Sequence, residues 1–217
     1  MSQSGSIGRC LLCGGSFSRA AMTRHLKSCG VDKPSNQPLN KSFHLFVEGR
    51  YSPVYWLHLA AGAEASLYAV DASLRGIWLE CCGHLSAFTI QGERYFSGCA
   101  DEIGGPGMEA SLGEILGPGM VFYHKYDSGS PTLLKLKVLG LRERSADQDK
   151  VEMLARNDAP HVVCHQCGNH SATNICMACQ SAGRGWLCEA CTATHKCGRD
   201  LYLPVANSPR AGVCGYS

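Results

Sequence analysis

The most regular pattern of hydrophobic and polar positions lies between residues 131 and 144. There Leu134, Leu136 and Val138 alternate with two lysines. A period of two predicts a strand with one buried face and one solvent-facing face. Residues 119–127 predict a second long strand, and we expect the two to be joined by the short connection between them.

A different period runs through residues 65–80, where apolar residues recur at steps of three and four. This pattern predicts an amphipathic helix, with Ser66 in the position of an N-cap. Residues 43–49 and 52–60 predict two strands with Gly49 in the turn between them, and residues 85–98 predict a hairpin that turns at Gln91–Gly92. Residues 108–117 predict a short helix, and residues 150–157 predict one further strand. The whole predicts an α+β fold, mostly antiparallel, with one main helix packed on the sheet.

These elements occupy only part of the chain. Residues 31–42 contain two prolines and no periodic apolar pattern, so they are predicted to be a linker. The expected organisation is therefore a small module at 8–30, the linker, a central domain at 43–160, and a cysteine-rich module with a tail at 161–217.

Cysteine usage changes this picture. The 217 residues include 14 cysteines, and 45% of the chain is hydrophobic. No apolar run reaches the ~18 residues that span a bilayer, and the first residues lack the features of a secretory signal, so we expect a cytoplasmic protein. Thiols in the cytosol stay reduced, and closely paired cysteines there indicate metal ligands rather than disulfides.

The first ligand set lies in the N-terminal module. Cys10 and Cys13 are followed after eleven residues by His25 and Cys29. This spacing supplies zinc with four ligands from a knuckle and a helix, which Ser18 is expected to cap, and it predicts a CCHC zinc finger. The alternative is a hairpin of reduced thiols, but so short a segment has too few apolar residues to fold without metal.

The second ligand set lies in the C-terminal module and would hold two zinc ions, which brings the expected total to three. Interleaved pairing joins Cys164/Cys167 to Cys188/Cys191 and Cys176/Cys179 to His195/Cys197. Sequential pairing instead joins each pair to its neighbour along the chain. We favour interleaving because the sequential arrangement leaves very short loops. Protein ligands fill every position, so no catalytic water is expected. The ligands are Cys164, Cys167, Cys176, Cys179, Cys188, Cys191, His195 and Cys197.

Charge is distributed unevenly along the chain. The net charge is +2, but residues 1–42 hold six Lys/Arg and one acidic residue, whereas residues 43–160 hold ten Lys/Arg and fifteen acidic residues. A basic head favours an anionic partner. We expect Arg19, Arg24 and Lys27 to meet nucleic acid, with a protein partner as the alternative and no membrane contact.

Residues 51–96 resemble the plasmid pRiA4b open-reading-frame-three-like family. The resemblance rests on His84, Leu85 and Phe88, on Tyr126, Asp127 and Gly129 of an aromatic hairpin, and on a C-terminal "PVANSPRAGVCGYS" similar to that of zinc-cluster-bearing members. It implies a small α+β fold of the roll type and no established activity. Some members are associated with mobile elements, but no serine-recombinase features are present here.

A last group of candidate residues lies between the predicted helix and hairpin. Cys81, Cys82 and His84 could form a further metal site with Cys99 or Asp101, although the side chains of adjacent cysteines are expected to diverge. The same residues, with Asp101 and His124, are the basis of an enzyme alternative. Cys214 is expected to be buried and unpaired.

The sequence thus favours a zinc-stabilised, non-catalytic interaction protein. Two alternatives stay open: an enzyme with a Cys/His cleft around Cys81, Cys82 and His84, and a redox or metal sensor whose clusters release zinc on oxidation.

Overall fold

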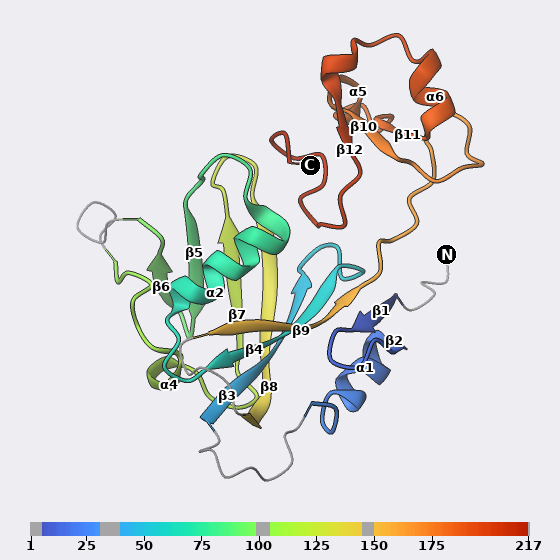
Figure 1. Cartoon of the computed structure of the whole chain (residues 1–217). Helices are drawn as coiled ribbons and strands as arrows, with labels where there is room; N and C mark the ends of the chain where they lie inside the picture. The colour runs from blue at the N-terminus through green and yellow to red at the C-terminus, as the bar shows by residue number, and fades with distance from the viewer. Residues whose placement is uncertain (1–5, 31–39, 99–104, 145–149, 217) are drawn as a thin grey trace.

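The chain forms two antiparallel sheets, seen in a computed structural model that describes residues 6–30, 40–98, 105–144 and 150–216 (Figure 1). The larger sheet has nine strands in the order β2-β1-β9-β4-β3-β8-β7-β5-β6, and the smaller has the order β11-β10-β12. The expected α+β class with a mostly antiparallel sheet is confirmed. The strands are β1 Ile7–Cys10, β2 Ser16–Ser18, β3 Asn40–Gly49, β4 Trp56–Gly62, β5 Ser86–Ile90, β6 Glu93–Phe96, β7 Val121–Tyr126, β8 Thr132–Arg144, β9 Val151–Asn157, β10 Asn174–Cys176, β11 Trp186–Leu187 and β12 Tyr202–Pro204.

Helices are few and short. The longest α-helix covers one face of the large sheet, and the cysteine-rich module carries two short helices beside the small sheet (Figure 1). The helical elements are α1 Arg19–His25, α2 Leu67–Leu74, the π turn η1 Arg75–Leu79, α4 Leu112–Ile115, α5 Met177–Gln180, α6 Glu189–Thr194 and the 3₁₀ turn η2 Arg199–Leu201.

The main helix begins as predicted but ends differently. The Ser66 side chain accepts a hydrogen bond from the Ala69 backbone, which confirms it as the N-cap. The helix was expected to continue to residue 80, yet it widens into a π turn in which Glu80 N–H donates to the Arg75 carbonyl at 2.9 Å. The wider turn leaves the consecutive residues Trp78 and Leu79 both fully buried.

The core of the large sheet follows the alternation in the sequence. Leu134, Leu136 and Val138 are fully buried beneath α2. Strand β4 is the exception, because all seven of its residues are buried. Its second face is covered by the N-terminal unit, where Met22 and Leu26 pack against Trp56 in a second apolar cluster.

The N-terminal unit is thus part of the large sheet. β1 pairs with β9, and Arg142 on β8 donates hydrogen bonds to the carbonyls of Leu26 and Cys29. β3 begins at Asn40, inside the segment predicted as a linker, and pairs with β8 from there; residues 31–39 lie outside the described residues. Ser18 occupies the N-cap position of α1, but its side chain makes no capping bond, contrary to expectation.

The C-terminal tail returns from the small sheet to the large one. The Asn207 side chain accepts a hydrogen bond from Asn157 Nδ2 and donates one to the Asn157 backbone carbonyl at the end of β9. Ser208 donates to the Trp78 carbonyl at 2.6 Å. Arg210 is fully buried and donates to Asp127 at 2.8 Å. The cysteine-rich module is therefore tied to the sheet by chain segments on both of its sides.

Beneath the N-terminal unit lies a buried histidine pair. His44 Nε2 and His58 Nδ1 are 3.0 Å apart, and burial, with a smaller contribution from the Arg142 charge, lowers their pKa values to about 4 and about 3. Both imidazoles are therefore neutral in the folded protein at neutral pH.

This pair is expected to make the protein less stable in mild acid. Because the folded-state pKa values lie below the unfolded value near 6.5, the unfolded chain binds more protons as the pH falls from about 6.5 towards 4. The loss is on the order of 1 to 3 kcal/mol at pH 5.5. Proton NMR should show the His44 and His58 ring resonances unchanged from pH 8 to 5; a transition above pH 6 would contradict the assignment.

No helix among the described residues is both long and apolar enough to cross a membrane.

Candidate metal centres

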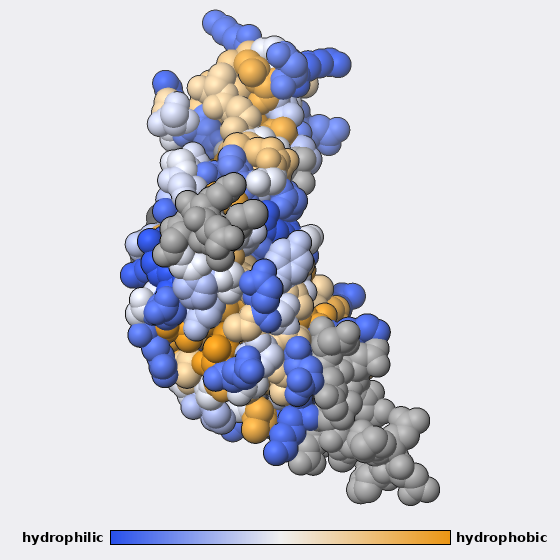
Figure 2. Space-filling model, turned by 90° about the vertical axis from the view of Figure 1, so that its left-hand side faces the viewer, coloured by the Kyte–Doolittle hydropathy of each residue, from blue (hydrophilic) through white to orange (hydrophobic). Residues whose placement is uncertain are grey.

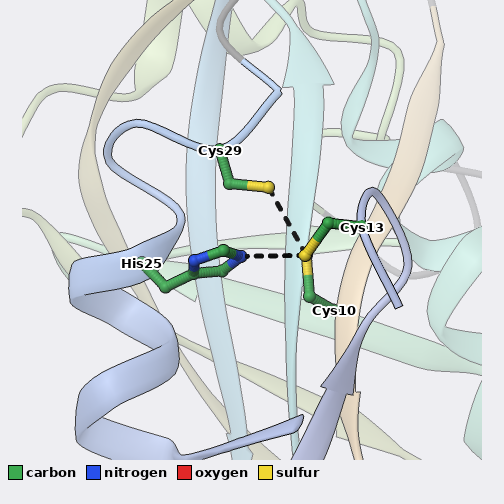
Figure 3. A group of neighbouring side chains, drawn as sticks. All are labelled: Cys10, Cys13, His25 and Cys29. Carbon is green, nitrogen blue, oxygen red and sulfur yellow. Dashed lines mark hydrogen bonds between the residues drawn. The ribbon is translucent and has the colours of Figure 1, made fainter. Parts of the chain in front are cut away.

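The N-terminal ligand set comes together at one point. Cys10 ends β1, Cys13 lies in the turn before β2, and His25 and Cys29 come from the end of α1 and the turn beyond it. Figure 3 shows the four side chains pointing toward one another. The His25 ring stacks on Phe17 with centroids 4.1 Å apart, which fixes its orientation.

The separations between these ligand atoms fit a tetrahedral ion. Metal–sulfur bonds of about 2.3 Å and metal–nitrogen bonds of about 2.0 Å place sulfurs about 3.8 Å apart and sulfur and nitrogen about 3.5 Å apart. The Cys10 and Cys29 sulfurs are 3.9 Å apart, and Cys13 Sγ lies 3.3 Å from His25 Nε2. A disulfide would need about 2.05 Å, and every cysteine in the described ranges is a free thiol.

The C-terminal ligands form two groups in the interleaved arrangement. One group is Cys164, Cys167, Cys188 and Cys191, and the other joins the second cysteine pair to His195 and Cys197. In the second group the Cys179 sulfur lies 3.4 Å from His195 Nε2 and 3.7 Å from the Cys197 sulfur. The sequential grouping is not the one found in the fold.

Few large apolar side chains are buried in this module; Ile175 and Leu187 are two of them. Its buried cluster consists of Leu187 and three of the cysteines, with Tyr202 and the other cysteines packed around it. The module also projects away from the large sheet, as the narrow upper part of Figure 2 shows. Its own apolar side chains are too few to specify a fold, so ligand–metal bonds would have to supply the missing stability.

Electrostatics in these groups favour a bound cation. The backbone N–H of Asn169, followed by the side chain and the backbone N–H of His170, lowers the pKa of Cys167 to about 5. Burial and the adjacent cysteine sulfurs raise the pKa of Cys191 to about 12, because thiolates this close repel one another. A divalent cation among the sulfurs removes that repulsion and lets all four ligands ionise.

A fourth group joins residues that are far apart in the sequence. Cys81, Cys82 and His84, between η1 and β5, meet Cys214 of the C-terminal tail. Cys82 Sγ lies 3.0 Å from His84 Nε2 and 3.7 Å from Cys214 Sγ. The Cys214 sulfur is also 3.2 Å from the same His84 nitrogen.

Two expectations about this group were wrong. Cys214 is exposed and belongs to the group, whereas it was expected to be buried and unpaired. Sulfurs of the adjacent Cys81 and Cys82 do not diverge but lie 3.6 Å apart, because the chain bends here before Gly83 takes a positive φ of 76°. Cys99 and Asp101, the ligands considered instead of Cys214, lie outside the described residues.

The loop that carries three of these ligands is held by a charged network. Arg75 donates to Asp71 and Glu80, each at 2.7 Å, and to the His84 carbonyl at 2.7 Å. Tyr126 donates to Glu80 at 3.0 Å, and its ring lies between the guanidinium groups of Arg75 and Arg210, each 4.8 Å from the ring centroid. These contacts hold the loop by protein side chains alone.

His124, a member of the enzyme alternative, has a different environment. It is fully buried, and its Nε2 lies 2.7 Å from Asp71 Oδ1. Ser86 donates to that same oxygen at 2.7 Å, so this serine is not hydrogen-bonded to the histidine as a nucleophile would be to its base. The structure therefore does not bring His124 into an open cleft with the cysteines.

Basic residues line a groove on the face of the large sheet opposite α2. Two adjoining hollows, which share Thr23 and Leu139, run between α1 and β8. Arg19 and Lys27 line one side and Lys135 and Lys137 the other; Arg24 is exposed but lines neither hollow. The single acidic lining residue is Glu48, which contacts Arg19 at 2.9 Å and Lys135 at 3.5 Å.

Comparison with known proteins finds similarity at the level of structure. No family model matches the chain, and no curated protein matches it. A crystal structure of a protein of unknown function, MM3350 from Methanosarcina mazei Go1, is similar over 54% of this chain and 69% of that chain, with 13% sequence identity and a TM-score of 0.47.

Proposed function

We propose that this chain is a zinc-stabilised, non-catalytic protein that binds nucleic acid in the groove between α1 and β8. The observation that carries this proposal is the charge of the groove. Four exposed or partly exposed basic side chains line it, and one carboxylate opposes them.

Zinc is the metal that suits the ligand sets. Thiolate sulfur and imidazole nitrogen in fours favour zinc among the common divalent ions. The N-terminal group is then a CCHC zinc finger on the edge of a roll-like domain, and the two C-terminal groups are a pair of structural zinc sites. Because protein atoms occupy all four positions of each, these ions have no open position for a catalytic water.

The position of the finger supports a phosphate-binding role for the groove. Met22 and Leu26 pack on the sheet, and the adjoining flank of α1, which carries Arg19 and Thr23, faces the same space as the exposed lysines of β8. Tyr123 pairs with Lys135 across the strands, and Arg50 lies over its ring at 4.8 Å. Exposed aromatic rings beside basic residues suit unpaired bases, so single-stranded nucleic acid fits this surface better than a duplex.

Binding of a labelled single-stranded oligonucleotide is expected to weaken steeply with salt. Four phosphate contacts give a slope of log K against log salt of about −3, which is a loss of roughly 50-fold between 50 and 200 mM. Replacing Lys135 and Lys137 by Ala should make this slope less steep by about 0.7 per lysine. Fluorescence anisotropy across a salt series measures both quantities.

Two matched variants sharpen the test. Arg24→Ala removes a basic residue from the same helix but outside the groove, so it should change binding much less than Lys27→Ala. Glu48→Gln should strengthen binding, because it removes the one carboxylate that neutralises Arg19 and Lys135. Equal losses for Arg24→Ala and Lys27→Ala, or weaker binding by Glu48→Gln, would contradict the assigned groove.

We also propose kinship with the pRiA4b open-reading-frame-three-like proteins. The motif residues that suggest it lie close together in space although they are far apart in the sequence. The His84 and Tyr126 rings are 5.8 Å apart, and Asp127 Oδ2 is 3.6 Å from His84 Nε2. If these motif residues have one structural role in common, they have to lie together in the fold, as they do here.

A further inference from the structure

We propose that Cys81, Cys82, His84 and Cys214 bind a fourth zinc ion, which fastens the C-terminal tail to the large sheet. The set offers three thiolates and one imidazole, a combination that zinc prefers. This inference does not depend on nucleic-acid binding, nor on which ion occupies the other three groups.

The ligand geometry matches that of the other three groups. In this group the sulfur–sulfur separations are 3.6 and 3.7 Å, and the sulfur–nitrogen separations are 3.0 and 3.2 Å. In the N-terminal and C-terminal groups the sulfur–sulfur separations are 3.7–3.9 Å and the sulfur–nitrogen separations 3.3–3.4 Å. All four ligand atoms lie within 4.8 Å of one another. These sulfur–nitrogen separations are shorter than the about 3.5 Å of a tetrahedral site, so binding of a central ion would move the His84 nitrogen outward by a few tenths of an ångström.

The surroundings also fit a metal–thiolate site. Arg210 Nη2 donates to the Cys81 sulfur at 3.5 Å, which stabilises a thiolate and offsets the single negative charge left by three thiolates and one Zn²⁺. The bend that points both adjacent cysteines inward depends on Glu80, which accepts a hydrogen bond from Gly83 N–H at 2.6 Å. Three ligands are thus held in place from one side.

On the other side, the backbone of Cys214 is held in an uncommon conformation. Its φ is +51°, in the left-handed region that non-glycine residues seldom adopt. In that conformation its sulfur lies within 3.7 Å of two other ligand atoms. A bond to a metal would compensate for the conformational cost of about 1 kcal/mol or more.

With this fourth ion, the cysteine-rich module would be attached to the large sheet by the chain segments on both of its sides. β9 leads out of the large sheet to this module, and the tail after β12 leads back to it. Asn207, Ser208 and Arg210 hold the first part of the returning tail. Zinc at Cys214 would hold its last part, so that the tail is fixed along its length.

Native mass spectrometry of the full chain, purified without added metal, tests the proposal. We expect four zinc ions in the wild type, three in Cys214→Ser and three in His84→Ala. His84→Cys restores a four-ligand set and should carry four. Cys99→Ser should also keep four, which separates Cys214 from the other cysteine that the sequence offered as a ligand.

The opposite results are equally clear. Three ions in both the wild type and Cys214→Ser, with the other groups filled, would overturn this site and leave the zinc scaffold standing. Four ions in Cys214→Ser but three in Cys99→Ser would give the fourth position to Cys99. A wild type with three ions and a mass lower by two hydrogens would identify a disulfide instead. Hydrogen exchange at the Val213 and Tyr216 amides should accelerate in Cys214→Ser and not in Cys99→Ser.

Discussion

Removal of metal with a chelator is expected to unfold the module of residues 161–204 and leave strands β3 to β9 of the large sheet folded. The buried cluster of the module is made of Leu187 and cysteines, and structural zinc sites contribute on the order of 10 kcal/mol per ion to folding. The large sheet, in contrast, has a core of its own with Trp78, Phe88 and Leu136 fully buried. Loss of metal should therefore lower the free energy of unfolding of the module much more than that of the large sheet.

Nuclear magnetic resonance can follow both parts in one sample. Amide signals from β10 to β12 should collapse to unfolded positions on chelation and return when zinc is added back, whereas signals from β3 and β8 should stay dispersed. Cys176→Ser should reproduce the collapse without chelator, and Cys99→Ser should not. Dispersed signals from β10 in the metal-free protein would show that the module folds on apolar contacts after all.

Replacement of Arg210 by Met is expected to release the C-terminal tail from the large sheet. The guanidinium is fully buried and donates to Asp127, to the Ser130 carbonyl at 3.1 Å and to Thr132 at 3.0 Å. Removing one partner of a buried, hydrogen-bonded ion pair costs about 3 to 5 kcal/mol. Its pairing with Asp127 also holds the pKa of that carboxyl down, at about 2, so the contact should persist through the physiological range.

Hydrogen exchange at the Ala211 and Val213 amides measures this release. Both amides donate within the tail, to the carbonyls of Ser208 and Arg210, and their exchange should accelerate roughly 100-fold or more in Arg210→Met. Arg210→Lys keeps the charge but not the forked geometry, so its exchange rates should lie between those of the wild type and those of Arg210→Met. Arg199→Ala, which removes an exposed arginine of the cysteine-rich module, serves as the control. Unchanged protection in Arg210→Met would mean that other contacts hold the tail.

Several features were determined by the sequence alone. Short-range patterns sufficed where a residue's environment is set by its near neighbours. The alternation around Leu136 defined a strand face, Ser66 marked the start of a helix, and the turn of the β5–β6 hairpin falls at Gln91 and Gly92, both with positive φ. The three closely spaced ligand sets could likewise be identified, because each set lies within a few tens of residues.

Other features were decided only by the tertiary structure, since they depend on segments that meet across long stretches of chain. Nothing in the local sequence marks Cys214 as a partner of Cys82, because 132 positions separate them. Burial of both faces of β4 follows from the N-terminal unit packing on it, and the groove combines lysines of β8 with residues of α1. Local periodicity reports which face of a strand is apolar, but not which distant segment covers it.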